Sequence, residues 1–150
     1  MDLILWRHAE AEPGEPDLGR RLTAKGIQQA ERMAEWLDRH LPSTTRVLSS
    51  PADRAQQTAQ ALKRKFKVVD DLAPGATVSA VLAAAGWPDS REAVLVVGHQ
   101  PTLGEVAALV LTDQALGWSI RKGAVWWLSN RIRDGMATTV VKVVIGPDFV

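Results

Sequence analysis

The sequence of 150 residues contains no cysteine. This absence excludes disulfide frameworks, thiol nucleophiles and thiolate metal sites, and it favours a reducing compartment. Tyrosine is also absent, and two phenylalanines accompany six tryptophans. Several of the tryptophans lie in or beside apolar segments, where core packing is their ordinary role, so they do not indicate stacking on nucleic-acid bases.

The chain also lacks an excess of either charge and any long apolar run. Eighteen Lys and Arg against 17 Asp and Glu leave a formal charge of +1, too little for a nucleic-acid-binding or membrane-surface protein. The apolar run Val106–Leu111 is far shorter than the ~20 residues that span a bilayer. The first residues have neither the basic start nor the apolar length of a signal peptide. We therefore expect a cytoplasmic protein with no nucleic-acid or membrane partner.

The length and a hydrophobic content of 46% suit a single domain covering residues 1–150. Short β-rich runs alternate with segments of helical spacing, which predicts an α/β fold. We expect a three-layer α/β/α sandwich with a mostly parallel sheet and an antiparallel edge hairpin. The predicted strands are 3–6, 46–49, 67–69 and 93–97, the hairpin is 124–128 with 138–145, and the helices are 23–41, 50–65, 78–85 and one from 102.

Two expectations concern the helices themselves. In the first helix, Ile27 is predicted to face the core together with Ala30, Ala34 and Leu37. In the second, Ser50 is predicted to be the capping residue, with proline following at the first helical position.

Basic side chains and histidines follow the predicted strands. Arg7 and His8 end the first strand, Arg54 lies in the helical turn after the second, and His99 follows the strand 93–97. Ligands of open α/β sheets bind at the carboxyl ends of the strands, so we expect these four side chains to converge. Two guanidiniums and an imidazole suit a compact dianion such as a phosphoryl group. The remaining histidine is a competent nucleophile toward phosphorus when neutral, a form that neighbouring cations favour by lowering its pKa.

The Arg-His dipeptide is not informative by itself. Arg39 and His40 repeat it at the end of the first predicted helix, where cations simply match the helix dipole. No cluster of carboxylates accompanies the three histidines, so we expect neither a metal nor a cofactor.

Three segments together resemble the histidine phosphatase superfamily, in the same order and with the same separations: Arg7–Glu10, Ser49–Ala59 and Val97–Pro101. The segment Asp17–Gly26 is most similar to the SixA branch, the phosphohistidine phosphatases. The resemblance implies that His8 is the phosphorylated nucleophile and that Arg7, Arg54 and His99 hold the phosphoryl oxygens. It also makes Asp17 and Arg20 candidate substrate-binding residues. Ala9 and Arg21 depart from the glycine and proline that are usual in the family.

The leaving group distinguishes the possible substrates. Hydrolysis of a phosphate ester expels an alkoxide and needs a well-placed acid, whereas imidazole leaves phosphohistidine far more easily. Glu10, Asp17 and Asp71 are candidate proton donors, and no signature selects one of them. The short spacing between the motifs leaves little chain for a lid. We therefore favour phosphohistidine on a phosphotransfer or phosphorelay protein. A phosphomonoesterase acting on a small phosphate ester and a non-catalytic phosphohistidine-binding module are the alternatives.

Overall fold

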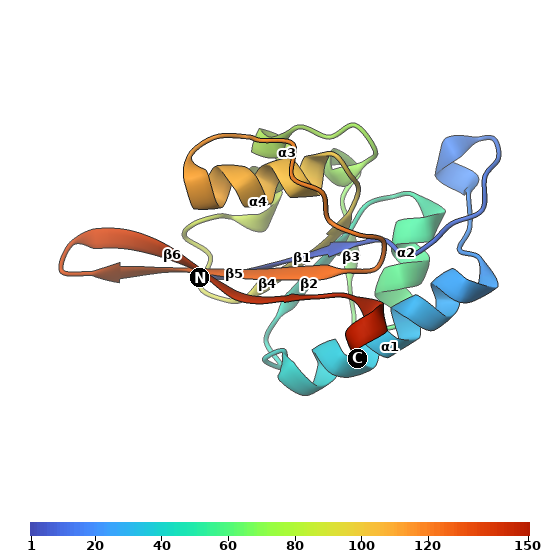
Figure 1. Ribbon diagram of the computed structural model, residues 1–150, viewed down its shortest axis with the longest axis horizontal. Helices are drawn as coiled ribbons and strands as arrows, with labels where there is room; N and C mark the ends of the chain where they lie inside the picture. Colours follow the sequence, from blue (N-terminus) through green and yellow to red (C-terminus); the bar gives the residue numbers. More distant parts are fainter.

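The computed structural model describes residues 1–150 and contains one six-stranded sheet with helices on both faces (Figure 1). The strands are β1 (Asp2–Arg7), β2 (Arg46–Ser49), β3 (Lys67–Val68), β4 (Val94–Gly98), β5 (Val125–Arg133) and β6 (Met136–Ile145). The helices are α1 (Ala24–His40), α2 (Asp53–Gln60), α3 (Val78–Ala85) and α4 (Thr102–Thr112). None of them combines the length and apolar character needed to cross a bilayer.

The sheet has the strand order β3-β2-β4-β1-β5-β6. The first four strands in this order are parallel, whereas β5 runs antiparallel to β1 and β6 antiparallel to β5. The β5–β6 hairpin extends beyond the rest of the sheet, at the left of Figure 1. This arrangement confirms the predicted α/β sandwich with an antiparallel edge hairpin.

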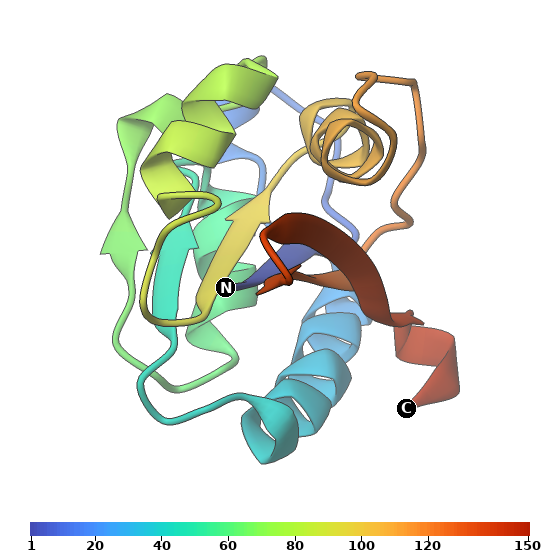
Figure 2. The ribbon, with the colours of Figure 1, turned by 90° about the vertical axis from the view of Figure 1, so that its left-hand side faces the viewer.

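Strand β1 lies at the centre because both of its faces are covered. Its residues Leu3, Ile4, Leu5 and Trp6 are fully buried, which explains why the segment shows no polar alternation. Leu3 and Leu5 pack with side chains of α3 and α4, and Ile4 and Trp6 pack with those of α1 and α2. Figure 2 shows α3 and α4 on one side of the sheet and α1 on the other.

The second helix is shorter than predicted, and Ser50 is not its cap. Helix α2 begins at Asp53, after the N-cap residue Ala52, and ends at Gln60. The Ser50 hydroxyl accepts a hydrogen bond from the Ala52 N–H and also contacts His99. Both contacts are made outside the helix, so the hydroxyl does not cap the first turn of α2. Beyond the helix, Lys63 has a φ of 56°, a left-handed conformation that prevents continuation.

The prediction that Ile27 faces the core was also wrong, because its side chain is 42% exposed. The buried stripe of α1 instead includes Gly26, where the helix packs directly on the loop after β1. A Cβ atom added at Gly26 would overlap the carbonyl oxygen of Glu10. This close approach fixes the start of the loop that carries Arg20.

We predict that Gly26→Ala destabilises the protein. Alanine favours a helix over glycine by about 1 kcal/mol, but the overlap with Glu10 separates two packed backbones, which costs about 1–3 kcal/mol. Urea unfolding measures the net loss. Gly117→Ala is the matched control, since a Cβ there meets nothing within 4 Å. Equal stability of the two variants would contradict the close packing of α1 on this loop.

Candidate active site

A cavity of about 200 Å³ lies where β1 and β4 end, and it contains the predicted cluster. Two histidines, three arginines and one lysine contribute to its wall, and no carboxylate does. The His8 and His99 rings lie 5.1 Å apart between centroids. The lining residues are Arg7, His8, Ala11, Arg20, Arg54, Pro74, His99, Gln100 and Lys122. The cavity therefore attracts a small anion.

The His8 ring is buried and positioned by the backbone next to it. Its Nδ1–H donates to the carbonyl oxygen of Ala9 at 2.7 Å, which leaves the lone pair of a neutral ring on Nε2. Burial, together with the smaller effects of the charges of Arg54, Arg7 and Arg20, lowers the pKa of His8 to about 4, against the opposing effect of the Ala9 bond. Burial therefore lowers the pKa of His8 more than the neighbouring cations do, although the sequence indicated the cations as the cause.

His99 is held by Ser50. Its Nε2 lies 2.7 Å from the Ser50 Oγ, and that hydroxyl already accepts from the Ala52 N–H. The Ser50 hydroxyl has no acceptor other than Nε2, so it donates its proton there, and the ring proton of a neutral His99 is on Nδ1. Burial, together with the smaller effects of His8 and Arg54, lowers the pKa of His99 to about 3.

Backbone carbonyls fix the arginines of the cavity. The Arg7 guanidinium donates to the Ile120 oxygen at 2.8 Å, and Arg54 donates to the Asp17 oxygen at 2.7 Å. Arg20 donates through Nε to the Glu12 oxygen at 2.7 Å. Three buried side-chain nitrogens have no partner in the protein: Arg7 Nε, Arg54 Nε and His99 Nδ1. Such donors are suited to the oxygens of a bound phosphoryl group.

None of the candidate proton donors lines the cavity. The Glu10 carboxylate accepts a hydrogen bond from the Thr23 hydroxyl, and Asp71 is exposed. Asp17 pairs with Arg20 and Arg54, whose hydrogen bonds lower the pKa of its carboxyl group. Asp17 therefore holds the two arginines in place, and its carboxylate is engaged in these ion pairs off the cavity wall.

Two departures from the family pattern are accommodated locally. Ala9 is fully buried without a positive φ, its N–H donates to the Thr58 hydroxyl at 3.1 Å, and its carbonyl oxygen accepts from His8. The methyl group therefore adds no backbone strain. Arg21 is exposed and lies 3.8 Å from the Asp53 carboxylate, on the outside of the loop.

Gln100 and Lys122 also line the cavity, although neither was predicted to do so, and Ser50 contacts His99 and does not cap α2. Lys122 precedes β5, and because β5 is antiparallel to β1, its beginning lies at the edge where β1 ends. The predicted edge hairpin could have indicated Lys122, because the first residues of an antiparallel strand lie beside the carboxyl ends of the parallel strands.

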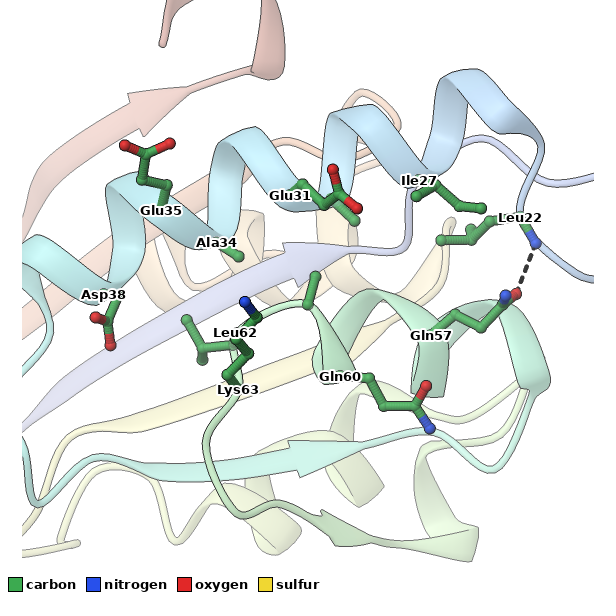
Figure 3. A pocket seen from close by; sticks show the side chains of 12 residues that line it. Leu22, Ile27, Glu31, Ala34, Glu35, Asp38, Gln57, Gln60, Leu62 and Lys63 are labelled. Carbon is green, nitrogen blue, oxygen red and sulfur yellow. Dashed lines mark hydrogen bonds between the residues drawn. The ribbon is translucent and has the colours of Figure 1, made fainter.

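A larger hollow between α1 and α2 carries mainly negative charge, unlike the cationic cavity (Figure 3). Its α1 side carries Glu31, Glu35 and Asp38, against the single cation Lys63. These carboxylates repel a phosphoryl dianion, so this hollow is not the phosphate site.

Comparison with known proteins agrees with the fold and the cavity. Residues 3–74 match the histidine phosphatase superfamily (branch 1). The chain belongs to this superfamily and is a hydrolase of the histidine-nucleophile phosphatase type.

Its similarity is to the SixA proteins. It is 32% identical over 124 residues to the phosphohistidine phosphatase SixA homolog of Haemophilus influenzae, covering 72% of this chain and 76% of that protein. It is 32% identical over 117 residues to phosphohistidine phosphatase SixA of Escherichia coli, covering 72% and 73%. The structure of a candidate phosphohistidine phosphatase SixA from Nakamurella multipartitia superposes with a TM-score of 0.80 at 26% identity, covering 97% and 95% of the two chains. The resemblance found in the sequence is thereby confirmed.

We predict that His8 and His99 stay neutral well below the usual imidazole range. NMR titration of the ring nitrogens should give midpoints near 4 for His8 and near 3 for His99. Unfolded imidazoles titrate near 6.5, so the unfolded state binds protons first and the free energy of unfolding falls as the pH drops from about 6.5 toward 4. His8→Gln should weaken this pH dependence, whereas the surface change His40→Gln should leave both ring titrations in place. A midpoint of 6.5 for either ring would contradict its burial.

Proposed function

We propose that the protein removes the phosphoryl group from phosphohistidine on another protein, through a covalent intermediate on His8. The observation that carries this proposal is the cavity itself, which has cations and two neutral imidazoles on its wall and no carboxylate. The similarity to SixA proteins from two organisms supports the same substrate class.

In the first step, the lone pair on His8 Nε2 attacks phosphorus. A P–N bond to His8 forms while the P–N bond to the substrate histidine breaks. A substrate ring that is protonated on its other nitrogen leaves as neutral imidazole, so this step requires no acidic side chain. The pKa of about 4 keeps His8 neutral, and therefore nucleophilic, at physiological pH.

In the second step, water attacks the phosphorus of phosphorylated His8. The P–N bond breaks, the electron pair returns to Nε2, and both protons of the water leave with inorganic phosphate as H2PO4⁻. Arg7, Arg54 and the Nδ1–H of His99 stabilise the phosphoryl oxygens in both steps. Because these donors are already oriented, little reorganisation is needed when charge develops in the transition state.

The choice of phosphohistidine over an ester follows from the surroundings of the leaving group. An alkoxide is a poor leaving group without a proton donor. Glu10, Asp17 and Asp71 all lie off the wall of the cavity. Phosphoramidate cleavage avoids this requirement, which is why the carboxylate-free cavity favours it.

We predict that the purified protein, assayed with a chelator present, releases phosphate from a phosphohistidine protein at least about a hundredfold faster than from a panel of phosphate esters. This factor is the scale on which general acid catalysis contributes to a rate. Free-phosphate detection measures both reactions. Faster turnover of an ester would establish the phosphomonoesterase alternative, and tight binding without phosphate release would establish a binding module.

We predict that rapid quenching during turnover traps phosphate on His8, in a linkage that is stable to base and labile to acid. His8→Ala should abolish both the label and the turnover. Arg54→Ala should lower kcat by about 10²–10³, the usual effect of removing one oriented donor. Arg39→Ala, at the far end of α1, is the matched control and should behave as the wild type. Label on a serine, or unchanged rates for His8→Ala, would refute the intermediate.

A further inference from the structure

A second groove adjoins the phosphoryl cavity and shares Arg7 and Lys122 with it. This groove has a volume of about 860 Å³ and lies between the segment before β5 and the residues from Val144 to Phe149. It is about four times larger than the phosphoryl cavity, so it can hold part of a molecule whose phosphate is bound beside His8. We call it the docking groove.

The docking groove carries two cations that the protein itself does not neutralise. Arg121 and Lys122 are exposed, and neither forms an ion pair within the protein. Asp148 is the one carboxylate on the wall of the groove. With Arg7, three cations therefore face one anion, and the groove favours a negatively charged surface.

Apolar side chains complete the wall. Val144 is 51% exposed and Phe149 is 79% exposed, while Trp126 is partly buried. Large apolar side chains of this kind beside unpaired cations are the composition of an interface that binds another protein.

The position of Arg121 and Lys122 relative to His8 is fixed by the backbone. The Gly123 N–H donates to the His8 carbonyl oxygen and the Arg7 N–H donates to the Ala124 oxygen, both at 3.1 Å. The Trp6 indole donates to the Gly123 oxygen at 3.0 Å. The backbone that carries Arg121 and Lys122 is therefore tied to the backbone of His8, so both side chains start at a fixed distance from the phosphoryl cavity.

We propose that the docking groove binds the phosphorylated partner protein through an acidic surface next to its phosphohistidine. Carboxylates of the partner pair with Arg121 and Lys122, and an apolar side chain packs against Trp126 and Phe149. Charge complementarity and continuity with the phosphoryl cavity support this occupant. The inference rests on the proposed function and adds the chemistry by which the substrate protein is selected.

The test assays the wild type and the Arg121→Glu variant on two substrates. Arg121 lies outside the phosphoryl cavity. Free phosphohistidine fills the cavity alone, whereas a phosphotransfer domain with carboxylates beside its phosphohistidine reaches both sites. We expect the variant to raise KM for the domain about tenfold, a loss of about 1.4 kcal/mol, with kcat and all constants for free phosphohistidine unchanged. Raised salt should weaken the wild-type reaction with the domain more than that of the variant.

Arg131→Glu is the matched control, since Arg131 is an exposed cation toward the opposite end of β5. Neutralising the carboxylates on the domain should reproduce the effect of Arg121→Glu in the wild-type enzyme. Equal KM values for Arg121→Glu and Arg131→Glu would overturn the docking groove, and so would an equal loss on both substrates.

Binding of the unphosphorylated domain, measured by calorimetry, separates this inference from the proposed function. If the wild type hydrolyses neither substrate but Arg121→Glu alone weakens binding of the domain, the function is wrong and the docking groove stands. If hydrolysis occurs and binding does not depend on Arg121, the function stands and the docking groove is wrong.

Discussion

The site depends on holding like charges together around an anion cavity. The carboxylate that pairs with two of them, Asp17 with Arg20 and Arg54, lies off the cavity wall. Arg7, Arg20, Arg54 and Lys122 repel one another around a cavity that no carboxylate lines. Backbone carbonyls of Ile120, Asp17 and Glu12 accept from the three arginines, so partial negative charge stabilises each guanidinium from outside the cavity. The apolar cores on both faces of the sheet supply the stability that keeps these segments in place.

Burial of ionisable side chains costs folding free energy, and the same burial keeps the imidazoles of the cavity neutral. Removing His8 from water disfavours its charged form, which adds to the effect of the nearby arginines and leaves the imidazole neutral. The Ala9 carbonyl and the Ser50 hydroxyl then determine which nitrogen of each ring carries the proton. Burial and charge therefore favour the neutral imidazoles, and hydrogen bonding selects the ring nitrogen that carries the proton.

The sheet and the convergence of Arg7, His8, Arg54 and His99 could be predicted because apolar periodicity and strand ends are local in the sequence. The role of Ser50 could not, because its hydroxyl is committed to His99, 49 residues away. The end of α2 depends on the left-handed conformation of Lys63, which no sequence pattern required. Lys122 was not predicted because only residues that follow strands were considered. Lys122 precedes β5, and the beginning of this antiparallel strand lies beside the end of β1.

A cavity that recognises only a phosphoryl dianion cannot tell one phosphorylated molecule from another, because the dianion is common to all of them. Discrimination must therefore come from two places outside the phosphoryl oxygens. One is the leaving group, where the lack of a carboxylate disfavours alkoxides. The other is the surface that continues from the cavity, where Arg121 and Lys122 have no internal ion-pair partners. The anion cavity and the cationic groove share Arg7 and Lys122, whereas Arg121 lies in the groove alone. Changes at Arg121 can therefore alter selection while the groups that surround the phosphoryl oxygens stay the same.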